Sequence, residues 1–143
     1  MFLSLGVGLL VSTSALATEI TPENLVGHYK AEAKVAFTRY YLSLRIIDNN
    51  DFEIQRTYPD GRKDESCNGT YSVGPSLFRK DLQVLVGKSF KGSFTCPSDR
   101  SRTNNFNINF GEKKLEDLVK GTSVTVTTSA APGMRLNAYV KKQ

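Results

Sequence analysis

The side chains that could carry acid–base, nucleophilic or metal chemistry are few in this sequence. It contains one histidine, His28, two cysteines, Cys67 and Cys96, and no tryptophan. Serine hydrolases need a base beside the nucleophile, often on a strained Gly-x-Ser-x-Gly turn, and the chain has no such turn. His28 lies between Gly27 and Tyr29 in a segment with strand character, so an ordinary strand residue is the better interpretation. Two thiols and one imidazole are also a poor set for structural zinc, which takes four ligands.

The acidic side chains do not form a recognisable catalytic or calcium site. Residues 48–51 offer oxygen ligands, but an EF-hand loop starting there needs glycine and glutamate where the chain has Glu53 and Pro59. A hairpin turn is the better interpretation. The adjacent pairs Asp64-Glu65 and Glu116-Asp117 do not suit a glycosidase, because neighbours on a strand or helix do not face one another. We therefore expect no catalytic residues, no metal and no cofactor, and we expect that the protein is not an enzyme.

The N-terminal segment indicates where the chain goes. Residues 1–17 carry no charged side chain, and they end in Ala15-Leu16-Ala17, which fits the small-x-small pattern of signal peptidase sites. The apolar run of about ten residues is too short to cross a hydrocarbon core of about 30 Å. We expect a signal peptide cleaved after Ala17 and export to the periplasm or the extracellular space. The alternative is a buried N-terminal helix or strand.

Export changes the interpretation of the cysteines. An oxidising compartment favours pairing Cys67 with Cys96. The disulfide would close a loop of about 30 residues, which stabilises the fold by roughly 3–4 kcal/mol in the chain-entropy model. The alternative is a pair of buried free thiols.

The elements that must position these residues are mostly strands, because apolar and polar side chains alternate with a period of two. The segment around Thr21 and Pro22 predicts a short helical turn, and residues 112–120 predict one short helix that ends at Gly121. We predict a single all-β domain over residues 18–143, either an antiparallel up-and-down barrel or a closed sandwich, with about eight strands. Beyond the first strand, the alternating runs are residues 42–46, 52–54, 67–73, 82–86, 90–94, 106–110, 124–126 and 136–140.

A single barrel makes a strict prediction about orientation, since strand side chains alternate between the two faces. The side chains expected to point inwards are Leu42, Leu44, Ile46, Phe52, Ile54, Phe90, Phe94, Phe106, Ile108 and Phe110. Those expected to point outwards are Ser43, Arg45, Glu53, Gln55, Asn105, Asn107 and Asn109. The candidates for contact with a bound ligand inside the barrel are Tyr29, Leu42, Leu44, Ile54, Phe90, Phe94, Phe106 and Phe110.

The first predicted strand resembles the opening of a known family. In Leu25-Val26-Gly27-His28-Tyr29-Lys30, a short helical turn leads into Gly27-x-Tyr29. This is similar to the start of the calycins, the lipocalins and fatty-acid-binding proteins, with Tyr29 in place of their tryptophan. The resemblance implies an up-and-down barrel whose apolar interior holds a small hydrophobic ligand.

Basic charge is the remaining surface feature, with a formal net charge of +5. The candidate basic patch consists of Arg79, Lys80, Lys88, Lys91, Arg100 and Arg102. The phenylalanines among them keep a period of two, which marks them as core rather than as a platform for stacking on bases. We therefore expect no nucleic-acid partner, and an acidic envelope surface, an acidic polysaccharide or an acidic protein as the partner of the basic charge. Plain solubility is the alternative role of that charge.

Together these features favour an exported, monomeric, non-enzymatic binding protein that does not span the membrane. It would hold a small apolar or amphipathic ligand in a lipocalin-like barrel. The alternative is an exported protein–protein interaction module, an enzyme inhibitor or an envelope accessory factor, with a filled core and a basic surface. An exported hydrolase is a third and less favoured class. Interior volume separates the first two, because a carrier needs a cavity and an interaction module does not.

Overall fold

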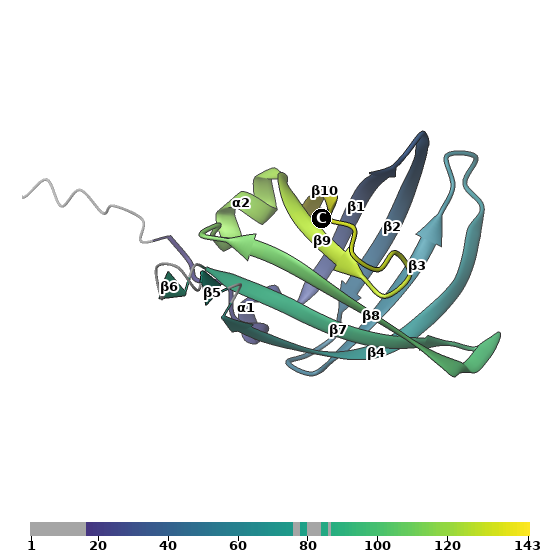
Figure 1. Cartoon of the computed structure of the whole chain (residues 1–143), viewed down its shortest axis with the longest axis horizontal. Helices are drawn as coiled ribbons and strands as arrows, with labels where there is room; N and C mark the ends of the chain where they lie inside the picture. Colours follow the sequence, from purple (N-terminus) through teal and green to yellow (C-terminus); the bar gives the residue numbers. More distant parts are fainter. Residues whose placement is uncertain (1–16, 76–77, 80–83, 86) are drawn as a thin grey trace, which may run out of the picture.

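The computed structural model describes residues 17–75, 78–79, 84–85 and 87–143, and its main feature is a closed antiparallel barrel. Each barrel strand pairs with the next one along the chain, and the last pairs with the first, in the ring β1-β10-β9-β8-β7-β4-β3-β2 (Figure 1). This confirms the up-and-down barrel. The barrel strands are β1 (Gly27–Val35), β2 (Thr38–Ile46), β3 (Asp51–Thr57), β4 (Lys63–Pro75), β7 (Lys88–Cys96), β8 (Asp99–Gly111), β9 (Thr122–Thr128) and β10 (Leu136–Lys142).

One predicted strand lies outside the barrel. Within residues 82–86 the described strand is β6 (Val84–Leu85), which pairs with β5 (Phe78–Arg79) in a separate two-stranded sheet. Leu82 and Val86 lie outside the described residues.

The turns between strands follow from local side-chain chemistry. Between β2 and β3, the Asp48 carboxylate accepts hydrogen bonds from the backbone N–H groups of Asn50 (2.8 Å) and Asp51 (2.7 Å). Between β3 and β4, the Gly61 N–H donates to the Tyr58 carbonyl at 3.0 Å with Gly61 at φ 90°. In the first turn, the aspartate side chain stabilises the backbone by accepting hydrogen bonds from the residues that follow it. In the second turn, glycine adopts a left-handed conformation without a steric penalty. The acidic segment 48–51 is thus a hairpin turn, as expected.

The two helices begin and end at capping residues. In α1 (Pro22–Leu25), the Thr21 hydroxyl accepts from the Asn24 N–H, which confirms the predicted helical turn. The second helix, α2 (Leu115–Lys120), is shorter than the predicted 112–120. Lys114 is extended, and the Asp117 carboxylate accepts from its N–H at 2.8 Å, so the helix starts only after Lys114. The residues before it complete the turn out of β8.

The barrel interior is filled with aromatic rings near α1. The Phe52 ring centroid lies 5.8 Å from that of Phe90 and 5.6 Å from that of Phe106, both in edge-on arrangements. Two strand glycines make room for these rings, because a Cβ atom on Gly69 or Gly92 would lie 2.7 Å from Phe52 or Phe106. The residues of this core are Ile20, Leu25, Tyr29, Leu44, Ile46, Phe52, Tyr71, Phe90, Ile108, Phe110, Leu118, Val124, Ala138 and Val140.

The predicted inward residues divide into two groups. Leu44, Ile46, Phe52, Phe90, Ile108 and Phe110 are buried, whereas Leu42, Ile54, Phe94 and Phe106 are half-buried. Among the residues predicted to point outwards, Arg45 and Asn105 are exposed and the others are half-buried. The register agrees with this division, since buried Leu44 pairs with Ile54 and exposed Arg45 pairs with Glu53. The period of two thus gives the core face of each strand.

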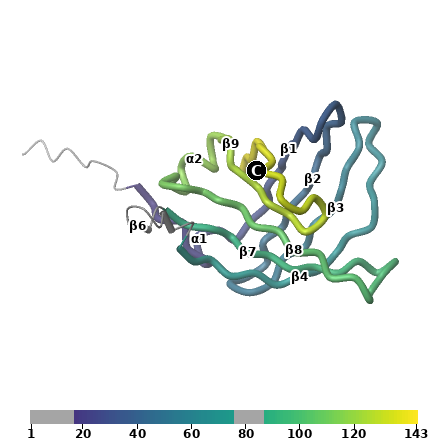
Figure 2. The backbone as a smooth tube through the Cα atoms, viewed as in Figure 1, coloured from purple at the N-terminus to yellow at the C-terminus, as the bar shows by residue number. Residues whose placement is uncertain are grey.

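The two ends of the barrel differ. The α1 end is plugged, because Leu25 is buried and the Tyr29 hydroxyl donates to its carbonyl at 2.7 Å. At the other end the strands separate. β8 pairs with β9 only over 106–109, so the first half of β8 continues with β7 as a hairpin that projects beyond the other strands (Figure 2). One end is therefore closed by packing and the other is open.

Candidate functional site

The open end of the barrel contains a pocket of about 450 Å³, here called the mouth pocket. It draws its lining from four strands that are consecutive around the ring, β2, β3, β4 and β7. This volume lies in the range of small-molecule sites, which favour the mouths of β-barrels. The lining residues are Leu42, Ile54, Gln55, Arg56, Asp64, Glu65, Cys67, Phe94 and Cys96.

The inner part of the mouth pocket is apolar. Ile54 pairs with Cys67 across β3 and β4, and Phe94 pairs with Gly69 on β4, which has no side chain to fill the space. The residues that β1 contributes on this face are Ala31, opposite Leu42, and Ala33. At the plugged end, aromatic rings fill the interior. At the open end, the small side chains of β1 fill less of it.

The rim of the mouth pocket is polar and held in place. The Arg56 guanidinium lies 4.6 Å from the Tyr40 ring centroid and 4.8 Å from that of Tyr58, both within the range of cation–π contacts. The Tyr58 hydroxyl donates to the Asp64 carboxylate at 3.0 Å. Glu65 accepts from the Ser98 backbone N–H at 3.0 Å and from the Ser98 hydroxyl. Arginine is thus fixed in orientation, while both carboxylates already have donors.

The disulfide forms one side of this rim. Cys67 and Cys96 are bonded, with their Cα atoms 4.4 Å apart, which confirms the predicted pair. Their sulfur atoms and a Glu65 oxygen are the one group of ligand-type atoms clustered closely enough for a metal in the described part of the chain. A disulfide offers no thiolate, so this group does not suit a metal ion.

The predicted ligand-facing residues are only partly brought together. Leu42, Ile54 and Phe94 line the mouth pocket. Tyr29, Leu44, Phe90 and Phe110 are buried in the core, and Phe106 is half-buried against it. The predicted set is therefore divided between the mouth pocket and the buried core. The lining residues absent from the predicted ligand-facing set are Gln55, Arg56, Asp64, Glu65, Cys67 and Cys96. Gln55 was predicted to point outwards, whereas Arg56 and Cys67 follow the same period of two as Ile54.

The residues considered for catalysis lie apart from the mouth pocket, except for one pair. His28 is exposed on β1, near the plugged end. Asp64 and Glu65 line the pocket with their carboxylates engaged, as described above. Glu116 lies in α2, where both of its oxygens accept from the Thr18 backbone N–H at 2.9 and 3.0 Å.

The candidate basic residues are spread along the barrel. Lys88, near the plugged end, donates to the Ile20 carbonyl at 3.0 Å and lies 3.8 Å from a Glu19 oxygen. Arg100 and Arg102 are exposed at the start of β8, at the opposite end of the β7–β8 ladder. Lys91 lies between them on β7. The side chains of Arg79 and Lys80 lie outside the described residues.

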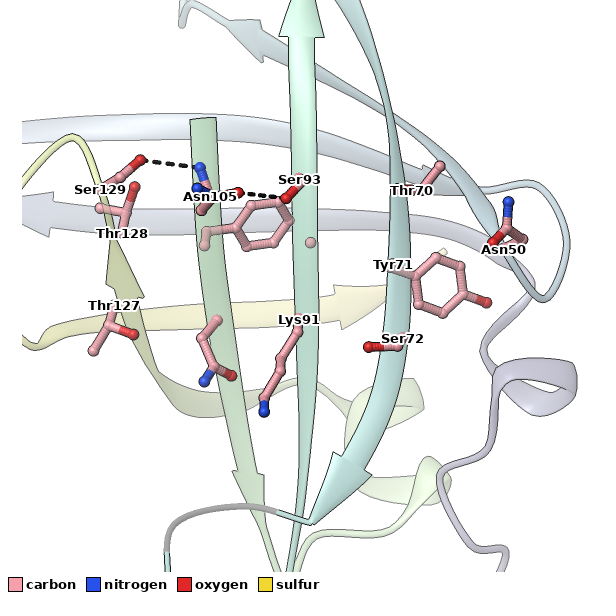
Figure 3. Close-up of a pocket in the computed structure, with 13 residues that line it drawn as sticks. Asn50, Thr70, Tyr71, Ser72, Lys91, Ser93, Asn105, Thr127, Thr128 and Ser129 are labelled. Carbon is pink, nitrogen blue, oxygen red and sulfur yellow. Dashed lines mark hydrogen bonds between the residues drawn. The ribbon is translucent and has the colours of Figure 1, made fainter. Parts of the chain in front are cut away.

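A second concavity, here called the outer basin, lies on the outside of β4, β7, β8 and β9 and has a volume of about 640 Å³. Sequence reasoning assigned Asn105 and Asn107 to the outer face without recognising a site. The signal in the sequence was the serine, threonine and asparagine residues that alternate with core residues. They form a site only because the strands that carry them are neighbours in the sheet. The lining residues are Asn50, Thr70, Tyr71, Ser72, Lys91, Gly92, Ser93, Asn105, Phe106, Asn107, Thr127, Thr128 and Ser129 (Figure 3).

Comparisons of this chain with protein-family models, with curated proteins and with solved structures found no match. The similarity of Gly27-x-Tyr29 to the calycin opening stays a prediction. The helices in the described ranges include none that is long and apolar enough to cross a membrane.

Proposed function

We propose that this protein is a non-enzymatic binding protein that holds a small apolar or amphipathic ligand in the mouth pocket. The observation that carries this proposal is the pocket of about 450 Å³ with Leu42, Ile54 and Phe94 inside and Arg56 at the rim. Apolar walls with a few fixed polar groups are typical of small-molecule sites. Such a pocket buries the apolar part of a ligand and leaves its polar end at the rim, beside the guanidinium of Arg56.

The proposal includes export, with cleavage after Ala17. Its support is the position of Thr18, whose backbone nitrogen lies 2.9 and 3.0 Å from the two Glu116 oxygens. A newly formed α-ammonium group there would make a bidentate ion pair with this carboxylate. The disulfide is compatible with the same compartment.

The test uses the chain 18–143 and the fluorescent probe 1-anilinonaphthalene-8-sulfonate, with lauric acid and dodecanol as competitors. We expect saturable binding to the folded protein, displaced by the competitors. Leu42→Gln places a polar amide in the mouth pocket and should weaken binding about tenfold or more, a loss of about 1.4 kcal/mol. Ser43→Gln, the next residue on the same strand but outside the pocket, is the matched control.

Two results would contradict the proposal. One is an absence of saturable probe binding to the folded wild-type protein, and the other is equal affinity of the Leu42→Gln and Ser43→Gln variants. Thermal unfolding of each variant, followed by circular dichroism, shows that the comparison is made between folded proteins.

A protein–protein interaction module is the second candidate function, and one observation favours it. Phe37, in the turn between β1 and β2, is 100% exposed, and Met134 in the loop before β10 is also exposed. Exposed aromatic and methionine side chains at one end of a rigid barrel suit contacts with another protein. Two results together would favour this function. The fluorescent probe would not bind saturably to the wild type, and Phe37→Ser would abolish a cross-link that the wild type forms to a partner protein.

A further inference from the structure

The outer basin is built from two neighbouring rungs of the sheet, away from the mouth pocket. Residues paired across β4, β7, β8 and β9 lie side by side, and Ser129 joins through its hydroxyl, which accepts from the Asn105 N–H at 2.9 Å. One rung consists of Thr70, Ser93, Asn105 and Ser129 (Figure 3). The other consists of Ser72, Lys91, Asn107 and Thr127.

The polar character of these rungs follows from the core. Because Phe90 and Ile108 are buried, the alternate residues Lys91 and Asn107 must point outwards. Every one of the eight rung residues is serine, threonine, asparagine or lysine, and the lining includes no carboxylate among the residues that the structure describes. Ordinary surface strands mix charges of both signs. This face instead offers hydroxyl and amide groups with a single cation.

Some of these polar groups have partners and one does not. The Ser93 hydroxyl donates to the side-chain oxygen of Asn105, and Figure 3 shows this bond beside the one between Asn105 and Ser129. The side-chain oxygen of Asn107 is buried and has no hydrogen-bond partner among the residues that the structure describes. A buried acceptor without a donor is costly, so a rotation of the Asn107 side chain toward a ligand that brings a hydroxyl donor would relieve that cost.

The basin does not suit the commoner partners of a protein surface. Of the two aromatic residues in its lining, Tyr71 is buried in the core and Phe106 packs against it, so neither is a protruding apolar anchor of the kind typical of protein interfaces. Nucleic acids are bound through several cations that neutralise phosphates, and the basin has one, Lys91.

We infer that the outer basin is a glycan-binding site, independent of the ligand proposed for the mouth pocket. Sugar hydroxyls both donate and accept hydrogen bonds, which matches a surface of hydroxyl and amide groups. The rungs cross four strands spaced about 4.8 Å apart, so the basin extends over about 14 Å and suits an extended chain. Lys91 sits in the second rung, where it pairs with the carboxylate of an acidic sugar.

The experiment titrates isotope-labelled protein, residues 18–143, with oligogalacturonate, hyaluronan fragments and neutral chitooligosaccharides, followed by NMR chemical shifts. We expect saturable shifts at the rung residues. Asn107→Ala should weaken binding about tenfold while leaving the melting temperature unchanged or raised, because it removes an unsatisfied buried acceptor. Lys91→Gln should reduce the preference for acidic over neutral chains. Asn137→Ala, an exposed asparagine on β10 outside the basin, is the matched control.

The inference is overturned if none of these oligosaccharides gives saturable shifts, if the shifts fall on the mouth pocket, or if Asn107→Ala and Asn137→Ala bind equally well. A lowered melting temperature of Asn107→Ala with unchanged affinity would assign that residue a structural role and also overturn it. The test of the mouth pocket uses a different probe and a different variant, so either proposal can fail while the other stands.

Discussion

At the scale of single residues, the barrel depends on side chains that alternate between a crowded interior and a polar exterior. On β8, Phe110 is buried in the core, while Asn107 lies on the opposite face in the outer basin. The two residues are three positions apart and contribute to different properties of the protein. Phe110 stabilises the fold, and Asn107 provides a group for binding.

Truncation of these two residues should therefore have unequal effects on stability. Phe110→Ala leaves a cavity in the core and should lower the free energy of unfolding by about 3–5 kcal/mol. Asn107→Ala should leave it about unchanged or raise it slightly, since its oxygen makes no hydrogen bond to another described residue. Denaturant unfolding of both variants measures the difference. Similar losses in both would contradict the assigned strand register.

At the scale of elements, the segment before α1 is tied to α2 and to the barrel. The Leu115 N–H donates to the Thr18 carbonyl at 3.0 Å, Glu19 pairs with Lys114, and Ile20 is buried. Its hydrogen bonds to Thr18 hold the pKa of the Glu116 carboxyl below its usual range. A lowered pKa means that the contribution of Glu116 to stability is present above its unfolded value of about 4.3 and is lost as the pH falls.

Cleavage after Ala17 should strengthen this connection. Glu116→Gln should lower the melting temperature of the form that begins at Thr18, because the α-ammonium loses a charged partner. The same substitution should have a smaller effect in a form that begins at Ser14, where Thr18 contributes only an amide N–H. The melting temperatures of the wild type and of Glu116→Gln, each in the form that begins at Thr18 and in the form that begins at Ser14, measure this difference. The intact mass of the exported protein shows whether cleavage occurs after Ala17. Equal losses in the two forms would argue against a charged N-terminus at Thr18.

At the scale of the whole molecule, one end of the barrel is plugged and the other is open. The plug includes two buried tyrosines near α1, Tyr29 and Tyr71, and the Tyr71 hydroxyl donates to the Asp48 carbonyl at 2.6 Å. Burial raises the pKa of both phenols, and the carboxylates of Asp48 and Glu23 add to the rise in the pKa of Tyr71. The plug therefore requires both hydroxyls to stay neutral.

Stability should consequently fall in alkali. A phenol whose pKa is raised by folding stabilises the protein fully below its unfolded value of about 10, and this contribution is lost as the pH rises further. We expect a decline in the melting temperature above about pH 10, beyond the range in which the α-amino group at Thr18 titrates. For one fully buried tyrosine the limiting slope is about 1.4 kcal/mol per pH unit. Tyr29→Phe should flatten the decline, whereas Tyr139→Phe, at an exposed position, should leave it unchanged.

The fold could be predicted from the sequence to a large extent, because its signals are local. The alternation of Phe106, Ile108 and Phe110 with asparagines assigns each side chain to a face without reference to any other strand. Thr21 marks the start of α1, because its hydroxyl caps a backbone N–H, and Gly121 marks the end of α2, because glycine adopts a positive φ. The helix start was wrong by three residues, because the backbone N–H of Lys114 is capped by a side chain further along the chain.

The sites, in contrast, were decided by tertiary structure. The mouth pocket needs four strands side by side, since Leu42, Ile54, Cys67 and Phe94 come from β2, β3, β4 and β7. No single segment of the sequence contains this arrangement. The outer basin needs four strands in a particular register, since Asn107 faces Thr127 only through pairing of β8 with β9. Thr18 meets Glu116 across 98 residues. The sequence by itself determined which face each strand residue takes, since alternation is a property of the local backbone. Which residues became neighbours was decided only when the strands closed into a ring, because register between strands is set by the packing of all of them together.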